Sequence, residues 1–276
     1  MGAKLLLENM RDTPGCFQED ILETLWAGLP ERFRTVDLAS DGLEPADRAA
    51  FTLGKHHRGF RLRFWQLPAP MDREMAWCCW RIADLGGRIP VGAVQGLIIS
   101  LARAAEDHPE FRGSLMEHTP REWERALAAA YARHYGRLPG KGWTLNTATV
   151  LRRCYQMLWA AYDQRPWWER EVWDPHLDRR IPLRDHEPNG DHSLYFQSLQ
   201  PLWLRHGFRW YLKVALETGE LTWTTARTRR SGIQVFGDWI TGHAVTLPAR
   251  APWSVRACSG CDPDTGQRGN ELILKP

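Results

Sequence analysis

The chain has 276 residues, of which 43% are apolar and 25% are charged, as in an ordinary soluble globular protein. Its formal net charge of +3 is too small to indicate nucleic-acid binding without a local concentration of basic residues. No apolar run approaches the length of a membrane span, and the first residues lack a secretory or myristoylation pattern. We therefore expect a cytoplasmic protein with reduced thiols and no contact with a membrane.

The six cysteines do not predict a metal site. Cys258 and Cys261 have the spacing of half a zinc knuckle, but no second pair of ligands follows them. The adjacent Cys78 and Cys79 suit neither a disulfide with each other nor a common metal. We expect no metal and no cofactor, and the spacing at the C-terminal end favours a tail with two free thiols.

Apolar periodicity predicts a mainly α fold, with minor β structure around residues 58–67, where Phe60, Leu62 and Phe64 alternate. Gly86 and Gly87 are expected to end one of the helices. The helices predicted in the first part of the chain cover residues 17–28, 71–85, 91–106, 119 to about 136, and 146–163.

The helix after residue 118 has the clearest start. Thr119 supplies a hydroxyl N-cap, Pro120 occupies the first helical position, and Glu122 stands three residues after the cap. Gly136 or Pro139 is expected to end this helix. We predict that it lies beside the 146–163 helix in a bundle.

Composition divides the chain into four parts. Residues 1–166 are expected to form an N-terminal helical domain, and residues 167–190 a linker rich in Trp and Pro, whose first part can pack as an aromatic anchor. Residues 191–245 are expected to form a second helical domain. Residues 246–276 lose periodicity and are expected to form an unstructured tail.

Two helices are predicted in the second domain. The first runs from about Ser198 to Thr218 and is closed by Gly219. The second begins near Thr222 or Thr224 and ends near Ile240 or Gly242. The pair therefore predicts a helix hairpin.

Arg205, Arg209 and Lys213 are spaced by four residues on the first of these helices. This spacing predicts one cationic stripe along two turns, which could meet a row of phosphates. The alternative is a solvated basic face with no ligand, and the spacing alone favours that alternative.

The second helix begins with hydroxyls and an arginine, in Thr224, Thr225 and Arg227. Such groups at a helix N-terminus can hold a phosphate, and they can also serve as plain N-caps. Arg230 interrupts the expected apolar stripe of this helix, and Gly232 adds a helix cost of about 1 kcal/mol relative to Ala.

Residues 167–242 resemble the region that precedes the catalytic domain in actinobacterial tyrosine-type integrases, while residues 1–166 resemble the upstream helical region of these proteins more weakly. The resemblance lies in Val172-Trp173-Asp174, Ile181-Pro182, Phe196, the run from Gln200 to Arg205, the turn Leu216 to Gly219, and the helix start Thr224 to Arg227.

In that family a small helical core-binding domain, SAM-like in fold, clamps one side of the recombination-site DNA. The resemblance therefore implies contact with double-stranded DNA through seven residues of this chain. They are Arg205, Arg209, Lys213, Thr224, Thr225, Arg227 and Arg229.

The chemistry of the family is not evident in this sequence. Its tyrosine nucleophile, arginines, lysine and His-x-x-Arg motif come from a domain that follows the core-binding domain, and only about 30 residues follow Gly242. His118 with Arg121 and His176 with Arg179 match His-x-x-Arg, but both precede the core-binding segment and are interpreted as chance. We assign no catalytic residue and expect no autonomous strand cleavage.

One hypothesis for the missing domain is a frameshift or early stop in an integrase gene, which the downstream reading frames would test. The function predicted is DNA binding in DNA integration or site-specific recombination. The partners expected are double-stranded DNA and either this chain itself or a full-length integrase, with no small-molecule substrate.

Two other hypotheses stay open. The first is a helical protein-interaction module that uses Trp-rich faces, which salt-dependent DNA binding would contradict. The second is a non-functional integrase remnant, which a cooperative unfolding transition would contradict.

Overall fold

The computed structural model describes residues 17–54, 58–184, 187 and 193–243. The expected unstructured tail at 246–276, with Cys258 and Cys261, lies outside the described residues. The same holds for the amino-terminal residues that bear on a targeting signal. None of the helices in the described ranges is both long and apolar enough to cross a membrane.

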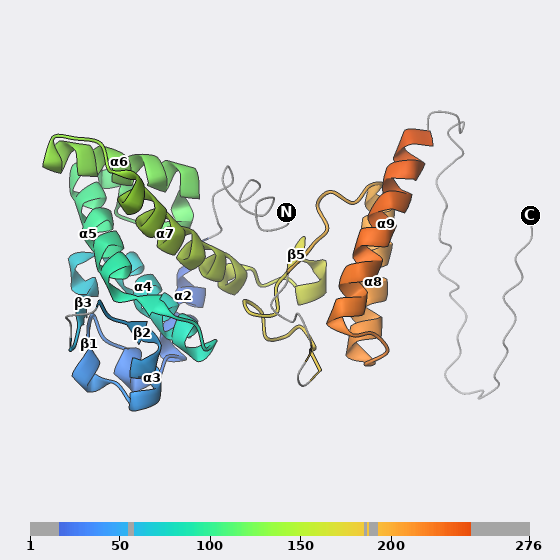
Figure 1. Cartoon of the computed structure of the whole chain (residues 1–276), viewed down its shortest axis with the longest axis horizontal. Helices are drawn as coiled ribbons and strands as arrows, with labels where there is room; N and C mark the ends of the chain where they lie inside the picture. The colour runs from blue at the N-terminus through green and yellow to red at the C-terminus, as the bar shows by residue number, and fades with distance from the viewer. Residues whose placement is uncertain (1–16, 55–57, 185–186, 188–192, 244–276) are drawn as a thin grey trace, which may run out of the picture.

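The described chain is mainly helical, which confirms the fold class predicted from periodicity (Figure 1). The longer helices begin and end within a few residues of the predicted ranges. The α-helices are α2 (Glu19–Ala27), α3 (Pro45–Ala49), α4 (Ala69–Asp84), α5 (Val91–Asp107), α6 (Pro120–Tyr135), α7 (Lys141–Tyr162), α8 (Leu202–Glu217) and α9 (Trp223–His243).

The β structure consists of short pairs. β1 (Asp37–Ala39) pairs antiparallel with β3 (Arg61–Arg63), and the facing residues Leu38 and Leu62 are both buried. The strand expected around 58–67 is therefore present in its central part, and a 3₁₀ turn follows it at Phe64–Gln66. β2 (Phe51–Thr52) pairs parallel with β4 (Ile89–Pro90), and β5 (Val172–Trp173) pairs antiparallel with β6 (Leu194–Tyr195).

The predicted capping of α6 is confirmed. The Thr119 hydroxyl accepts a hydrogen bond from the Glu122 backbone N–H, and the Glu122 carboxylate accepts one from the Thr119 backbone N–H. Two of the donors left open at a helix N-terminus are thereby satisfied. Gly136 ends the helix with a φ of 66°, a conformation that glycine adopts without steric cost.

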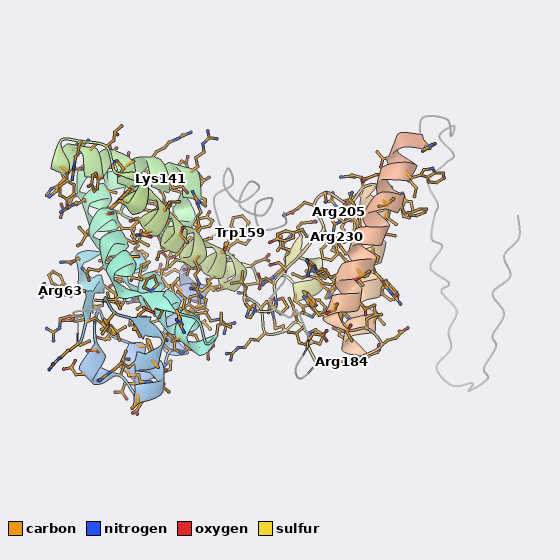
Figure 2. The ribbon with its side chains drawn as sticks, in the orientation of Figure 1. Arg63, Lys141, Trp159, Arg184, Arg205 and Arg230 are labelled. Atoms are coloured by element: carbon orange, nitrogen blue, oxygen red, sulfur yellow. The ribbon has the colours of Figure 1, made fainter. Side chains whose placement is uncertain are left out.

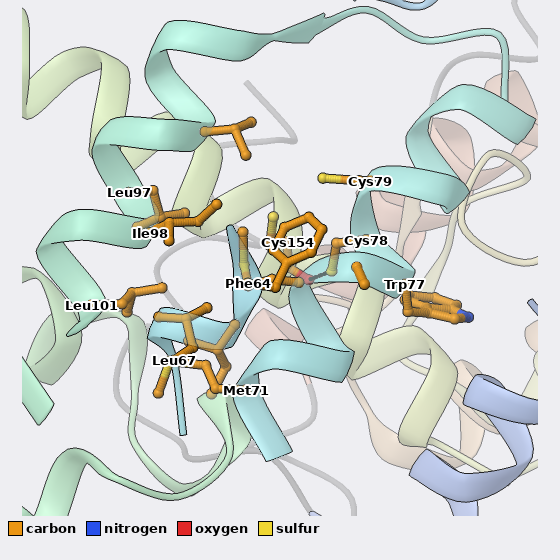
Figure 3. Close-up of a cluster of buried hydrophobic side chains, with 14 of the residues drawn as sticks. Phe64, Leu67, Met71, Trp77, Cys78, Cys79, Leu97, Ile98, Leu101 and Cys154 are labelled. Carbon is orange, nitrogen blue, oxygen red and sulfur yellow. Dashed lines mark hydrogen bonds between the residues drawn. The ribbon is translucent and has the colours of Figure 1, made fainter. Parts of the chain in front are cut away.

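The first hydrophobic core lies among α2, α4, α5, α6 and α7. α5 packs against both α6 and α7, and its side chains Leu97, Ile98 and Leu101 point into the core that Figure 3 shows. Cys78 lies in the same core and its thiol donates to the Cys154 carbonyl oxygen at 3.7 Å. Burial raises the pKa of the Cys78 thiol, so that it stays protonated and unreactive.

One carboxyl group lies inside this core. Glu74 is fully buried and accepts hydrogen bonds from the Ser114 hydroxyl, from the Leu115 backbone N–H at 2.8 Å and from the Tyr162 hydroxyl at 3.0 Å. Desolvation raises its pKa to about 7, although the three hydrogen bonds favour the ionised form. Its charge therefore changes near neutral pH.

A second hydrophobic core begins at Trp167 and extends to Ala226. Trp167, Trp173 and Ile181 belong to it, and β5 joins the same part of the molecule as α8 and α9 (Figure 1). The expectation of a linker over residues 167–190 is thus corrected for its first fifteen residues. Their aromatic and aliphatic side chains are needed because two helices alone have too little apolar surface to enclose a core.

The segment between β5 and residue 181 also contacts the first core. Arg81 on α4 donates to the Leu177 carbonyl oxygen at 3.2 Å, and Arg179 donates to the Asp84 carbonyl oxygen at 3.0 Å. Residues 173–181 therefore contribute side chains to the second core and also form hydrogen bonds with α4, which belongs to the first core.

Candidate nucleic-acid interface

The predicted helix hairpin is formed by α8 and α9. Gly219 closes α8 with a φ of 69°, and the Leu221 N–H returns to the Ala215 carbonyl oxygen at 3.0 Å. The Thr222 hydroxyl then accepts from the Thr225 backbone N–H at 3.1 Å and caps α9. Trp223, at the first position of α9, is fully buried and fixes that end of the helix in the second core.

Arg209 differs from the expectation of a cationic stripe. Its side chain is only 3% exposed, and one of its terminal nitrogens donates to the Glu169 carbonyl oxygen at 2.8 Å and pairs with Glu171 at 3.0 Å. Burial lowers the pKa of this guanidinium, while the Glu171 carboxylate opposes that shift. Arg209 therefore holds the 169–171 segment onto α8 and presents no surface to a ligand.

Arg205 has a similar position. It donates to the Leu199 carbonyl oxygen at 3.0 Å and to the Gln197 carbonyl oxygen at 2.8 Å, and lies 3.5 Å from Glu171. Figure 2 shows Arg205 and Arg230 on the side of the hairpin that faces β5. Lys213 is partly exposed but pairs with Glu217, one turn further along α8, at 2.8 Å. The three cations predicted as a stripe are thus all paired with carboxylates.

The hydroxyls expected at the start of α9 serve mainly as caps. The Thr225 hydroxyl lies 2.8 Å from the Thr222 hydroxyl. The Thr224 backbone N–H donates to the Glu187 carboxylate at 3.3 Å, so a protein anion already occupies part of the site where a phosphate was expected.

Arg227 and Arg229 are the members of the predicted set that stay exposed in the first turns of α9. Neither forms an ion pair with any residue in the described ranges. The Arg229 guanidinium lies over the Tyr211 ring, 5.7 Å from its centroid, in a cation–π arrangement that leaves its donors open to solvent. These two side chains are free to reach an external phosphate.

Arg230, which interrupts the predicted apolar stripe of α9, has protein partners. It is half-buried and donates to the Tyr195 carbonyl oxygen and to the Ser198 hydroxyl, so it ties α9 to β6 and to the residues that follow it. Gly237, which the sequence did not single out, lies where α9 crosses the residues before α8. A Cβ there would come within 2.3 Å of the Gln200 carbonyl oxygen.

The hairpin also has an exposed aromatic face, which consists of Trp203, Trp210, Phe236 and Trp239. Trp203 is 65% exposed and Trp210 is 58% exposed. The Phe236 and Trp239 rings stack at 6.2 Å. Positions 203, 207, 210 and 214 share one side of α8, and positions 229, 232, 236 and 239 share one side of α9.

The contact between Arg229 and Tyr211 places this side of α9 next to Tyr211, the residue that follows Trp210 on α8. Trp123, Trp173 and Trp223, by contrast, are fully buried. A helix that has only one helical neighbour cannot bury apolar residues on all of its faces. The apolar residues on several faces of α8 could therefore have indicated that Trp203 and Trp210 are exposed.

Comparison of the chain with protein-family models, with curated protein sequences and with solved structures finds no match. Within the described residues, no three His, Cys, Asp or Glu side chains are grouped closely enough to hold a metal ion.

Proposed function

We propose that the α8–α9 hairpin binds double-stranded DNA, as part of DNA integration or site-specific recombination. The observation that carries the proposal is the pair Arg227 and Arg229, exposed near the N-terminal end of α9 without an acidic partner in the described ranges. The integrase-like residues of the same hairpin support it. The proposal includes a cytoplasmic location and assigns no strand cleavage to this chain.

The contacts of the residues in the predicted DNA-binding set support different roles for different members. Arg227 and Arg229 are proposed as the main phosphate contacts. Thr224, Thr225 and Lys213 would contact DNA only if a phosphate replaced their present protein partners. Arg205 and Arg209 are proposed to shape the hairpin rather than to touch DNA, because their donors are directed to backbone carbonyls and Glu171.

The test is the affinity for a DNA duplex as a function of salt, measured by fluorescence anisotropy. The double variant R227Q/R229Q should weaken binding and lower the magnitude of the slope of log K against log salt by about 2, because each phosphate contact contributes about 0.9. The matched control is R61Q/R63Q, which removes two exposed arginines at the same i, i+2 spacing from β3.

The control variant should bind as the unchanged chain does. Equal affinity and equal salt slope for R227Q/R229Q and the unchanged chain would contradict the proposal. Equal losses in both double variants would show that only overall charge matters, and that result would contradict the hairpin as the site.

A second candidate function is protein association through the exposed aromatic face. Large exposed apolar side chains are typical of interaction sites where they group on one surface, and Trp is enriched among energetic hot spots. The partner to test first is a second copy of this chain. This chain and a full-length integrase are the two protein partners expected from the sequence.

Light scattering at increasing concentration tests this candidate. Self-association should be weakened by W203Q/W210Q and unaffected by W65Q, since Trp65 is 55% exposed but lies in the first part of the molecule. A chain that stays monomeric at all concentrations would contradict self-association.

A further inference from the structure

A pocket of about 480 Å³ lies where the segment 163–180 meets α2, α4 and the end of α7. This volume falls within the range of small-molecule sites, which is roughly 300–1,000 Å³. The pocket is separate from the hairpin surfaces proposed above, so an inference about it does not depend on DNA binding.

One wall of the pocket is apolar. It contains Trp77 and Trp80 from α4, whose rings meet edge to face at 6.3 Å, together with Leu25 and Leu177. Figure 3 shows that the Trp77 ring points away from the Phe64 and Leu101 side of the core. Trp80 is only partly buried, so its ring can contact a flat apolar group.

The other wall is rich in guanidinium groups. Arg81, Arg170, Arg179 and Arg180 line the pocket, and Arg165 adjoins them through Asp163. Three carboxylates form ion pairs with these groups, and each of the three lies near two of them. Asp84 lies 2.8 Å from both Arg81 and Arg179.

Asp163 and Asp178 are shared in the same way. Asp163 pairs with Arg165 at 2.7 Å and lies 3.6 Å from Arg170, while Asp178 lies 3.0 Å from Arg170 and 2.8 Å from Arg180. The four guanidinium groups that line the pocket thus share three carboxylates, one of which, Asp163, also pairs with Arg165.

Arg170 provides separate evidence, because one of its buried hydrogen-bond donors has no acceptor. Its side chain is 8% exposed, yet its Nε, which lies 3.6 Å from an Asp163 carboxylate oxygen, donates no hydrogen bond. A buried donor without an acceptor costs about 1–3 kcal/mol and is uncommon in folded proteins. Burial lowers the pKa of both Arg81 and Arg170, and nearby arginines lower it further. A bound anion would relieve both effects.

The number of guanidinium groups indicates the class of anion. A phosphate monoester carries about −1.5 to −2 at neutral pH and has three acceptor oxygens, so it can pair with more of these groups than a single carboxylate can. The planar guanidinium fork binds phosphate oxygens in pairs. The apolar wall fits a base, because bases stack on Trp rings.

We propose that this pocket binds a nucleoside phosphate, with the phosphate at Arg81, Arg170, Arg179 and Arg180 and the base against Trp80. The same chemistry is present in a free nucleotide and in the 5′-phosphorylated end of a DNA strand. Both sources offer one phosphate next to one base.

Isothermal titration calorimetry of the full chain with AMP, GMP, CMP and dTMP tests the proposal, with inorganic phosphate and the four nucleosides as partial ligands. At least one nucleotide should bind about tenfold or more tightly than phosphate and than its own nucleoside. No binding of any nucleotide at millimolar concentration would overturn the proposal. Equal affinity for phosphate and nucleotide would overturn the assignment of the apolar wall to a base.

Arg179 and Arg133 provide matched variants. Arg179 is 59% exposed and pairs with Asp84 at 2.8 Å, and Arg133 is 56% exposed and pairs with Asp107 at 2.8 Å on α5, away from the pocket. R179Q should weaken nucleotide binding about tenfold or more, as expected for the loss of one charged hydrogen bond, and R133Q should not. R180Q provides a second pocket variant if R179Q unfolds. Unchanged affinity in a folded pocket variant would overturn the proposal.

Competition distinguishes the two sources. Displacement of the nucleotide by a 5′-phosphorylated oligonucleotide, but not by its unphosphorylated twin, would assign the site to a DNA end. No displacement by either would assign it to a free nucleotide.

Discussion

The guanidinium of Arg209 lies 3.0 Å from the carboxylate of Glu171, a residue 38 positions earlier in the chain. The same side chain donates to the Glu169 and Arg170 carbonyl oxygens. A cation that its spacing assigned to a DNA-facing stripe is therefore a central contact between α8 and the Trp-rich segment.

Replacing Arg209 with Gln should destabilise the chain. The substitution leaves two carbonyl oxygens and a carboxylate without their donor, and the free energy of unfolding should fall by about 3 kcal/mol. Denaturant unfolding followed by circular dichroism measures it. The matched variant R227Q, on an exposed arginine of α9, should change the free energy by less than about 0.5 kcal/mol. A stable R209Q chain with reduced DNA affinity would instead support a direct DNA contact.

Two glycines of α9 should respond in opposite directions to Ala. A Cβ at Gly237 would lie 2.3 Å from the Gln200 carbonyl oxygen, whereas a Cβ at Gly232 would meet nothing within 4 Å. G237A should lower the free energy of unfolding by about 1–3 kcal/mol because the backbone must shift. G232A should raise it by up to about 1 kcal/mol through helix propensity.

Thermal unfolding of both glycine variants measures these effects. Similar small changes in the two variants would show that α9 does not pack closely on residue 200. A broad, non-cooperative transition of the unchanged chain would favour the integrase remnant among the hypotheses drawn from the sequence.

Glu74 should make stability depend on pH in an unusual direction. Its folded-state pKa of about 7 lies above the ordinary 4.5, so between these values the folded chain binds more protons than the unfolded chain. The stabilisation is complete below about pH 4.5 and is lost as the pH rises to about 7, with a total of about 3 kcal/mol.

Unfolding free energies at several pH values from 4.5 to 8 check this prediction. Asp72 contributes a change of the same sign, since burial raises its pKa to about 6, so the comparison must be made with E74Q. E74Q cannot ionise and should show a smaller fall with rising pH. Identical pH profiles for E74Q and the unchanged chain would show that Glu74 does not titrate in this range.

Local signals predicted the helices well. Thr119 with Glu122 marked the start of α6, and Gly136 and Gly219 marked ends that the structure places within two residues. These signals are reliable because a cap and its partner are separated by three or four residues. The mainly helical fold followed directly from them and from apolar periodicity.

The candidate site was less predictable, because its interactions connect distant parts of the chain. Spacing on one helix does not reveal that Arg209 meets residues 169–171, or that Arg230 meets Tyr195 and Ser198. Both arginines satisfy carbonyl oxygens of short elements far away in the sequence, namely the 3₁₀ turn Trp167–Glu169 and β6. Whether a basic side chain faces solvent or such a segment depends on packing that periodicity does not encode.

The membership of Trp167, Trp173 and Ile181 in the second core determines where this protein can be divided for expression. A fragment that begins at residue 191 would lack these three side chains and the β5 partner of β6, and its exposed apolar surface would favour aggregation. A fragment that begins near residue 163 keeps them, together with the Glu171 partner of Arg209. The shortest unit worth purifying on its own therefore begins near residue 163, about thirty residues before the start at residue 191 that the sequence predicted for the second domain.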